Sequence, residues 1–505
     1  MKNINIEDHK SLFEREDYKE MLQKKAEYYE DAHPTEKVNE ILEWTKTKEY
    51  KELNFSRKSI VINPLKACQP LGALYAAIGL RDTMPYVHGS QGCAAYFRSH
   101  FSRHFREPFI TVSDSMTEEA AVFGGLNNMI EGLMNAYQLY KPKAIAVCTS
   151  CMAEVIGDDL NSFIKKSKDS GSIPPDLPVI YANTPSFVGS HIVGYDNMLL
   201  NILSQIGKKD PSKKNDSINI IMGFDTYLED FREIKNICES FDIKYNILSD
   251  PSDVLDSPTD GNYTLYRGGT PLEIIEDAPN AKATLILQKY STTKTKSFIE
   301  RQWEHPVKVV NPIGIDGADS LMMALSELSG KDIPKNLEAQ RGIAIDAIAD
   351  SYYNVYGKSF SLNADPDLAI GLTRFILELG GKINHILLTN GTKKWKREVE
   401  AILDEFGVKE DAEVYFKNDQ WHFRSLLFDR PPDYIIGNAY AKFLSRDTSI
   451  PLIRIGFPLH DRCNLHRYTI IGYRGIINLL TWIVNTILED EDYKTRNNQS
   501  YDVIK

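Results

Sequence analysis

Apolar residues follow two different periods along most of the chain. From Ile60 onward, short runs of apolar and β-branched residues alternate with longer stretches in which apolar residues recur every three or four positions. The short runs predict buried strands and the longer stretches predict amphipathic helices, an alternation typical of parallel sheets with helices on both faces. Strands are predicted at residues 144–147, 179–182, 218–222, 284–287, 307–310, 386–388, 413–416, 434–436 and 452–455, and helices at 73–80, 118–137, 228–238, 367–379 and 394–406.

The first 60 residues have a different pattern. They are dense in Lys and Glu, and apolar residues such as Met21 and Leu22 are scattered at roughly helical spacing. Such a segment has too few apolar residues to bury a core of its own. We therefore expect an extension whose apolar residues lie along a partner subunit or along the body of the protein.

The length predicts about three domains in the remainder, since a domain typically takes about 150 residues. The chain has 505 residues, and charged or proline-containing linkers are expected at residues 208–216 and 330–338. The predicted fold class is α/β, with three doubly wound, Rossmann-like domains of mainly parallel sheets and the N-terminal extension. The expected boundaries are 1–60, 61–210, 211–335 and 336–505.

Composition narrows the functional classes. The chain is 42% hydrophobic and 26% charged, as in an ordinary globular protein, and its net charge of -11 argues against nucleic-acid binding. It has no run of 18 apolar residues, and its start, MKNINIEDHK, lacks the apolar core of a signal peptide. We therefore expect a cytoplasmic protein without a membrane partner, whose six cysteines are thiols or metal ligands and not disulfides.

Two cysteines lie in segments rich in turns and small residues. Cys68 follows Pro64 and precedes Pro70 and Gly72, and Cys93 ends the run Gly-Ser-Gln-Gly-Cys. Thiolates at a loop or at the start of a helix suit a metal cluster, and glycine allows the backbone to approach it closely. A single unpaired cysteine, however, is more often a small buried apolar residue.

Another cysteine and a serine follow two of the predicted strands. Cys151 comes after the strand at 144–147, and Ser186 comes after the strand at 179–182. Ligands of open α/β sheets collect beyond the carboxyl ends of strands, so a bound group is expected there. The pair Cys148-x-x-Cys151 lacks the context of a thioredoxin-like redox motif. Three thiolates leave a shared cluster one ligand short, and spacing alone leaves a metal site and ordinary thiols equally open.

Four blocks of sequence resemble a known family. They are Lys-Ala-Cys-Gln-Pro at 66–70, Gly-Ser-Gln-Gly-Cys at 89–93, Cys-Met-Ala-Glu-Val-Ile-Gly-Asp-Asp at 151–159 and Thr-Pro-Ser-Phe at 184–187. In this order and spacing they closely resemble the beta subunits of nitrogenase molybdenum-iron proteins. The similarity continues through residues 123–125, 421–426 and 451–458, and so covers nearly the whole chain.

The resemblance implies a set of cluster ligands. Cys68, Cys93 and Cys151 match the three beta-subunit ligands of an [8Fe-7S] P-cluster, to which an alpha subunit donates three more cysteines. Ser186 matches a serine whose oxygen joins an iron when the cluster is oxidised, and a hard oxygen donor suits the more oxidised iron. From the residues alone, Ser186 would instead be a loop hydroxyl that caps a helix.

The aromatic pair Tyr96 and Phe97 follows Cys93. The resemblance implies that the two rings fill the space between the P-cluster and the molybdenum-iron cofactor of the alpha subunit. Their residue types alone favour ordinary core aromatics.

The resemblance also implies a role in electron transfer. Electrons from an ATP-hydrolysing iron protein would pass through the P-cluster to the alpha-subunit cofactor, where dinitrogen is reduced to ammonia by an α2β2 heterotetramer. Phe123 matches the phenylalanine at which the iron protein docks, although its type alone favours a core residue. The chain has no P-loop of its own, because Tyr352 stands where the first glycine ahead of Gly357-Lys358-Ser359 would be needed.

Two aspartates form a further candidate metal site. Asp346 and Asp350 are four residues apart and would share one helical face, which is usually just a solvated surface. The resemblance implies a mononuclear calcium or iron(II) ion between two beta subunits, bound by Glu107 and the carbonyl of Arg106 from one and by the two aspartates of the other. These are all oxygen donors, which suit either ion.

Some features leave alternatives open. Cys148 replaces the hydroxyl residue expected at its position, and we interpret it, like Cys238 and Cys463, as an ordinary thiol. The alternatives to a molybdenum-iron beta subunit are a cofactor-assembly scaffold subunit of the same superfamily, the beta subunit of a vanadium or iron-only nitrogenase, and more distantly a dark-operative protochlorophyllide reductase. Ser186 together with the three cysteines, the long first 60 residues and the block at 421–426 favour a nitrogenase. Among nitrogenases, the vanadium and iron-only beta subunits have shorter N-termini, which fit this chain less well.

Overall fold

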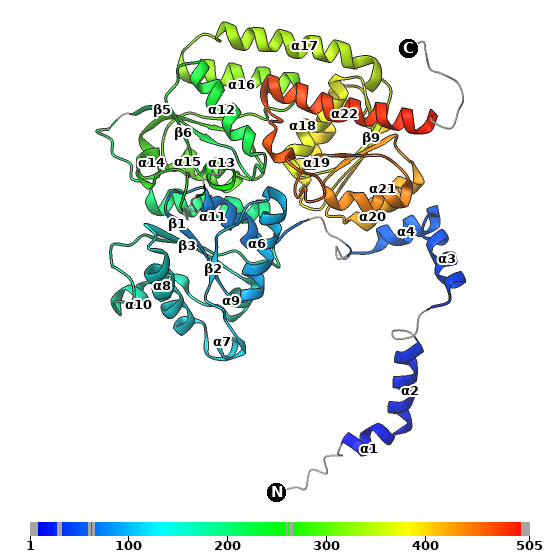
Figure 1. Cartoon of the computed structure of the whole chain (residues 1–505), viewed down its shortest axis with the longest axis horizontal. Helices are drawn as coiled ribbons and strands as arrows, with labels where there is room; N and C mark the ends of the chain where they lie inside the picture. Colours follow the sequence, from blue (N-terminus) through cyan, green and yellow to red (C-terminus); the bar gives the residue numbers. More distant parts are fainter. Residues whose placement is uncertain are drawn as a thin grey trace. The chain divides into compact units, whose positions relative to one another are not determined.

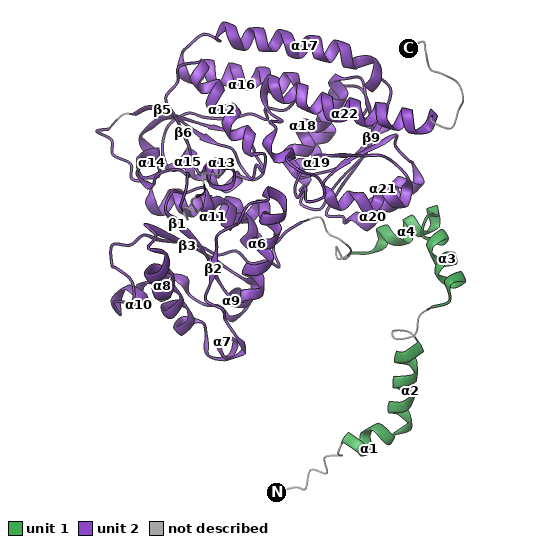
Figure 2. Ribbon diagram, viewed as in Figure 1, with its two compact units in different colours: residues 1–58 green, residues 59–505 purple. Residues whose placement is uncertain are grey.

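The computed structural model describes residues 9–27, 33–58, 62, 66–213, 215–258, 261 and 266–495. The chain divides into two compact units, Met1–Lys58 and Ser59–Lys505 (Figure 2). Residues 1–8, 28–32 and 59–60 of the predicted extension, and residues 63–65 of the predicted loop before Cys68, lie outside the described residues.

The first unit is helical. Its described part contains α1 (His9–Glu14), α2 (Glu16–Lys25), α3 (Thr35–Trp44) and α4 (Lys48–Ser56). Large apolar side chains such as Phe13, Met21 and Ile41 are exposed, and no apolar side chain in the described part of this unit is buried. Its helices therefore do not build a core, as expected from their composition.

The first sheet of the second unit carries the cysteine-bearing loops. Its strands β1 (Thr83–His88), β2 (Val112–Ser113), β3 (Ala144–Thr149) and β4 (Val179–Ala182) are parallel, in the order β2-β1-β3-β4. The chain moves from β1 to one side to form β2 and then to the other side to form β3. The order of the strands thus reverses between β1 and β3. The helices of this part are α5 (Gln69–Ile78), α6 (Gln91–Phe105), α7 (Glu118–Phe123), α8 (Leu126–Tyr140), α9 (Cys151–Ile156), α10 (Leu160–Asp169) and α11 (His191–Ile206).

The second sheet has the same topology as the first. Its parallel strands β5 (Asn215–Ile221), β6 (Tyr245–Ile247), β7 (Ala281–Ile286) and β8 (Val307–Val309) have the order β6-β5-β7-β8. The helices of this part are α12 (Leu228–Ser240), α13 (Ser252–Leu255), α14 (Leu272–Asp277), α15 (Thr293–Gln302) and α16 (Gly314–Ser329).

The third sheet is also parallel and is doubly wound. Its strands β9 (Ser359–Asn363), β10 (Lys382–Leu388), β11 (Glu413–Phe416), β12 (Tyr434–Gly437) and β13 (Leu452–Arg454) have the order β11-β10-β9-β12-β13. Its helices are α17 (Lys335–Val355), α18 (Pro366–Glu378), α19 (Lys393–Glu405), α20 (Gln420–Asp429), α21 (Lys442–Thr448) and α22 (Gly472–Thr495). The predicted α/β fold class with parallel sheets is confirmed.

The observed elements differ from the predicted ones in two ways. Strands β1, β2, β6 and β9 lie outside the predicted strands, and β1 contains Pro85, which pairs with Ala146 of β3 although a proline has no N–H to donate to a central strand. The predicted helix at 118–137 is broken into α7 and α8 at Gly124, whose φ is 85°. An L residue rarely adopts that backbone conformation, and glycine adopts it at no steric cost.

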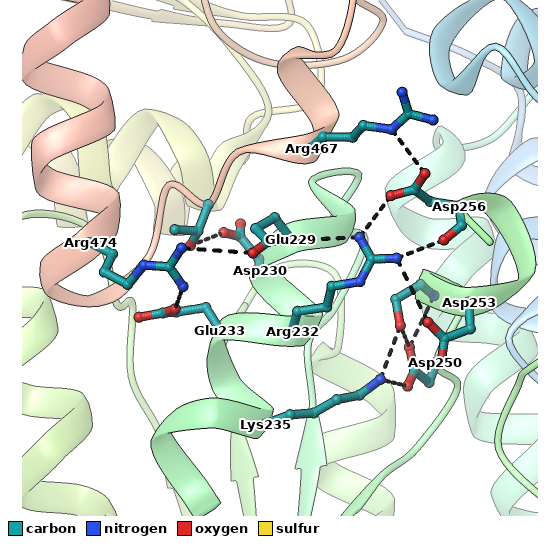
Figure 3. Close-up of polar contacts among 12 residues, drawn as sticks. Glu229, Asp230, Arg232, Glu233, Lys235, Asp250, Asp253, Asp256, Arg467 and Arg474 are labelled. Atoms are coloured by element: carbon teal, nitrogen blue, oxygen red, sulfur yellow. Dashed lines mark hydrogen bonds and ion pairs between the residues drawn. The ribbon is translucent and has the colours of Figure 1, made fainter. Parts of the chain in front are cut away.

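Ion pairs connect the C-terminal part of the chain to α12 of the second sheet (Figure 3). Nη1 of Arg474 lies 2.6 Å from Oε2 of Glu233 on α12. Nε of Arg467 lies 2.9 Å from Oδ1 of Asp256, and the other oxygen of this carboxylate pairs with Arg232 of α12. The hydroxyl of Thr469 donates to buried Asp230 at 2.6 Å. Helix α22 then packs on α16 and α17 (Figure 1), and a single hydrophobic core runs through the second and third sheets.

The long helices show no sign of a membrane span. Among the residues that the structure describes, no helix combines the length and the apolar character that a bilayer crossing requires.

Candidate metal-cluster site

Three cysteines lie at the starts of three helices in the part of the chain built on the first sheet. Cys68 is the N-cap residue of α5, Cys93 lies in the first turn of α6, and Cys151 is the first residue of α9. The free N–H groups at the start of a helix favour a negatively charged ligand such as a thiolate. Cys68 and Cys93 are partly buried, and Cys151 is exposed.

The three thiols are close enough to influence one another. Burial raises the pKa of the Cys93 thiol, and the neighbouring Cys151 and Cys68 raise this pKa further. Thiols placed together resist ionising together, because each thiolate repels the next. A cluster of several metal ions that binds all three would displace their protons and remove this repulsion.

The position of the site follows from the topology of the sheet. Cys93 follows β1 and Cys151 follows β3, the two strands between which the strand order reverses. Open α/β sheets bind ligands at such a switch point, beyond the carboxyl ends of the strands. The backbone there is tightly packed, since a Cβ atom on Gly89 would lie 1.9 Å from Oγ of Ser150. Only glycine fits at that position.

Gln69 holds the loop that carries Ser186. Its side-chain amide donates to the carbonyl of Pro185 at 2.9 Å and to that of Val188, on either side of Ser186. Its amide oxygen accepts a hydrogen bond from Asn197 at 2.9 Å. The residue next to Cys68 therefore positions the half-buried Ser186. No local pattern in the sequence signals this role of Gln69, because its partners are more than 100 positions away in the chain.

A second set of hydrogen bonds joins the Ser186 loop to the end of β3. The backbone N–H of Thr184 donates to the hydroxyl of Thr149 at 2.8 Å, and the hydroxyl of Thr184 donates to the carbonyl of Thr149 at 2.7 Å. Glu154 accepts from Asn183 at 2.9 Å and from Thr149. These bonds connect the loop carrying Ser186 to α9, which begins at Cys151.

The other cysteines have different environments. Cys148 is completely buried on β3, where burial raises the pKa of its thiol far above the usual range. Burial likewise raises the pKa of Cys238 to about 12, and Cys463 is exposed. Cys148 and Cys238 therefore stay protonated as small apolar groups, in agreement with the interpretation of them as ordinary thiols.

The aromatic residues near the site divide into buried and exposed ones. Phe97 is buried in the core, and Tyr96 beside it is 48% exposed. Phe123 ends α7 and is 82% exposed, and Val122 before it is 75% exposed. Phe123 is thus a surface residue and not the core residue that its type alone favours.

The four residues of the candidate cation site are distributed over two regions. Arg106 ends α6 in a left-handed conformation, with Glu107 next to it, whereas Asp346 and Asp350 are exposed on α17. In the described part of the chain, no three His, Cys, Asp or Glu residues are grouped closely enough to hold a single metal ion, and this applies to the three cysteines as well as to these carboxylates. One chain therefore does not assemble the four ligands of the candidate cation site.

A second crevice lies where the second and third sheets meet. Its lining includes Phe224 and Asp225 after β5, Asp367 after β9 and Phe457 after β13, and its volume is about 40 Å³. We call these four residues and the space between them the junction. Such a space has room for only about two or three water molecules. Burial raises the pKa of Asp225 and of Asp367 to about 7.

The fold and the grouped cysteines together define a class of protein. Residues 68–488 match the family model described as nitrogenase component 1 type oxidoreductase, and residues 2–54 match a domain of unknown function. The chain belongs to the nitrogenase component 1 type oxidoreductases.

Within this family, the chain is similar over nearly its full length to beta chains. It is 53% identical to the nitrogenase molybdenum-iron protein beta chain of a Nostoc species, an alignment that covers 99% of this chain and 98% of the relative. It is 52% identical to the protein of the same name from Azotobacter vinelandii, covering 97% and 96%. The predicted resemblance is confirmed, and with it the assignment to an oxidoreductase subunit for nitrogen fixation.

Solved structures support the same assignment. A chain of the structure titled "Nitrogenase Cp1 at pH 6.5" superposes with a TM-score of 0.86 at 39% identity, covering 89% of this chain and 98% of that one. A chain of "Nitrogenase Cp1 at pH 5" superposes with a TM-score of 0.66 at 18% identity and shows the same fold. Membership in this family implies metal clusters and a molybdenum-iron protein complex with an alpha subunit.

Proposed function

We propose that this chain binds one half of an [8Fe-7S] P-cluster through Cys68, Cys93 and Cys151, and that an alpha subunit supplies the other half. The observation that carries the proposal is the placement of three thiols at three helix starts around the switch point of the first sheet. These residues fit an iron–sulfur cluster in donor type, and Gly89 allows the loop of Cys93 to pack against Ser150, next to Cys151.

The surface around the thiols supports an interface there. Val155 of α9 is 76% exposed, and Phe187 and Val188 beside Ser186 are 64% and 59% exposed. Exposed apolar side chains next to a half-complete ligand set are typical of a surface that another subunit covers. The alpha subunit is the proposed occupant, and the N-terminal unit, with exposed apolar side chains such as Phe13, is proposed to contact it too.

When bound, the cluster would store electrons on their way from the iron protein to the alpha-subunit cofactor. The chain's own residues hold and tune it: three thiolates donate charge, and the interface excludes water. The hydrogen bonds from Gln69 hold the Ser186 loop. The hydroxyl of Ser186 would thereby be available to the cluster as an additional oxygen donor. We propose that the complex accepts electrons from an ATP-hydrolysing iron protein and reduces dinitrogen to ammonia.

Two further surfaces belong to the proposal. Phe123 and Val122 form an exposed apolar pair at which the iron protein docks. Asp346 and Asp350 of one beta chain and Glu107 with the Arg106 carbonyl of another bind a calcium or iron(II) ion between the two. Ile343 and Tyr353, also on α17, are 60% and 88% exposed, which supports burial of this helix against the second beta chain.

The predicted boundaries at residues 60, 210 and 335 remain part of the proposal as domain limits. The relatives' names favour the molybdenum-iron class over a scaffold subunit or a vanadium or iron-only enzyme.

The test compares the chain expressed with and without its alpha partner. Iron content and the absorption and paramagnetic spectra of the cluster would be measured for both. We expect the intact cluster only in the complex, because the isolated chain has half of the thiolates. Full cluster spectra from the isolated chain would contradict the proposal. In the complex, Ser186→Ala should leave the spectrum of the reduced cluster unchanged and alter that of the oxidised cluster.

A further inference from the structure

His88 lies at the centre of a buried charged cluster next to the proposed site. It is the last residue of β1, and its ring binds Asp114 through Nδ1 and Asp158 through Nε2, the latter at 2.9 Å. The side chains of His88 and Asp114 are completely buried, and that of Asp158 is 3% exposed. Burial opposes the charged form of His88, but the hydrogen bonds and charges of Asp114 and Asp158 outweigh this effect and raise its pKa.

One side of this cluster contacts the loops that carry the cysteines. Asp114 accepts a hydrogen bond from the backbone N–H of Gly89 at 2.9 Å, four residues before Cys93. The carbonyl of His88 accepts the backbone N–H of Ser150 at 3.0 Å, one residue before Cys151. The backbone of His88 and the side chain of Asp114 therefore hold both loops in place.

The other side contacts the turn after Phe123. Asp158 accepts the backbone N–H of Gly125 through both carboxylate oxygens at 3.2 Å. A Cβ atom on Gly125 would lie 2.6 Å from Cε1 of His88 and 2.7 Å from Oδ2 of Asp158. The turn between α7 and α8 thus rests directly on the imidazole and on its carboxylate partner.

We propose that His88 is a positioning residue that links the docking surface at Phe123 to the loops of Cys93 and Cys151. This inference rests on the proposed function and deepens it. A displacement of the Phe123 turn by the docked iron protein moves Asp158 through its two bonds to Gly125. Asp158 in turn moves the imidazole, and the backbone of β1 carries the displacement to Ser150 and Gly89.

Because each ring nitrogen of His88 binds a different aspartate, substitutions can remove the bond to Asp114 and the bond to Asp158 separately. In His88→Asn the amide nitrogen takes the place of Nδ1 and keeps the bond to Asp114, while the bond to Asp158 is lost. In His88→Gln the amide nitrogen takes the place of Nε2 and keeps the bond to Asp158. The proposal requires the Asp158 bond, so the asparagine variant should be uncoupled and the glutamine variant should keep most of the coupling.

The experiment uses the whole complex with its iron protein. Two quantities are measured: the electrons transferred per ATP hydrolysed, and the hydrogen exchange of amides at residues 89–93 and 150–152 with and without docked iron protein. In the unmodified complex, docking should change the exchange at both loops. We expect His88→Asn to abolish this change and to lower the electron yield per ATP about tenfold, with normal iron content. His385→Asn, at a buried histidine of β10, is the matched control.

Gly125→Ala tests the same link at the turn after Phe123. Its methyl group would displace the turn from His88, so this variant should also lose the docking-dependent change in exchange and the electron yield per ATP. The proposal is overturned if docking leaves the exchange of both loops unchanged in the unmodified complex. It is also overturned if His88→Asn and Gly125→Ala keep full coupling, or if His88→Asn and His88→Gln lose it equally. Two other outcomes would instead contradict the proposed function itself. One is an unmodified complex without the cluster, and the other is a Phe123→Ala complex that binds the iron protein and couples ATP hydrolysis as well as the unmodified one.

Discussion

The carboxyl edge of the first sheet carries exposed and half-buried thiols, whereas the edges of the second and third sheets close against each other at the junction. Both places obey the same rule for α/β folds, by which ligands bind beyond the carboxyl ends of strands. At the first sheet, glycine and small residues surround Cys93 and Cys151. At the junction, the rings of Phe224 and Phe457 lie 5.4 Å apart and leave only about 40 Å³.

The difference shows that topology selects the place of a site and that side chains decide whether it is open. Large rings fill the junction, and the buried His104 beside it is kept neutral. His104 packs 5.0 Å from Phe457, and burial lowers its pKa to about 3. At the first sheet, Cys68 and Cys93 are only partly covered by the core of their own chain and Cys151 is exposed, so the thiols stay accessible.

The largest effect is expected from removing one of the thiols. Cys93→Ala should abolish the cluster and the activity of the complex together, because the proposed cluster loses one of its six thiolate ligands. Cys148→Ala is the matched control, since this thiol is buried in the same sheet and held in its protonated form. Iron analysis and cluster spectra of both variants provide the measurement. A Cys93→Ala complex with its full cluster spectrum would show that the open edge is not a ligand site.

A smaller effect is expected at the exposed surface near this edge. Phe123→Ala should weaken binding of the iron protein by about 2 kcal/mol, or about thirtyfold in Kd, as for an aromatic residue at the centre of an interface. The coupling of ATP hydrolysis to electron transfer should fall with it, while metal content stays normal. Phe443→Ala, at a phenylalanine of α21 that is 53% exposed, is the control. Equal Kd values for the two variants would contradict the assignment of Phe123 to the docking surface.

Near the junction, we expect an effect of pH on the stability of the fold and no effect on metal content. His104 is neutral in the folded chain, with a pKa near 3, whereas in the unfolded chain it takes up a proton below about pH 6.5. The stability from this residue is therefore present above pH 6.5 and is lost as the pH falls toward 3, by about 1.4 kcal/mol per pH unit.

His104→Asn should reduce this dependence. Its amide oxygen can still accept from the N–H of Leu459, the bond that Nδ1 accepts at 2.9 Å in the native chain. Urea unfolding of the complex between pH 7 and 5 would measure the slope of stability against pH for both proteins. An unchanged slope would contradict the assignment of a neutral buried histidine beside the junction.

The smallest effect is expected at the exposed carboxylates of α17. Asp346→Asn with Asp350→Asn should lower the chelator concentration that splits the tetramer, by an amount corresponding to about 1 kcal/mol or less for solvent-accessible charges. Cluster spectra should not change. Glu338→Gln, at an exposed position of the same helix, is the control. A tetramer of unaltered chelator resistance, with no cation detected by anomalous scattering at this position, would contradict the site.

Much of the fold could be predicted because its signals are local. The run Val179–Ala182 is apolar and β-branched and forms β4 with these bounds, and α12, α18 and α19 lie within two residues of their predicted ends. The α/β class follows from the alternation of such segments. Strands β1, β2, β6 and β9 lie outside the predicted strands, and in β1 the proline at position 85 argues against the central place that the strand takes in its sheet.

The sequence by itself determined the family and which cysteines stand in its motifs, since these depend on residue type and spacing. Only the tertiary structure decided which distant side chains meet. Gln69 reaches the carbonyl of Pro185 across 116 positions, and His88 reaches Asp158 across 70. No local pattern signals such pairs, because a hydrogen bond between distant segments depends on which strands become neighbours, and that order is fixed by the packing of the whole sheet.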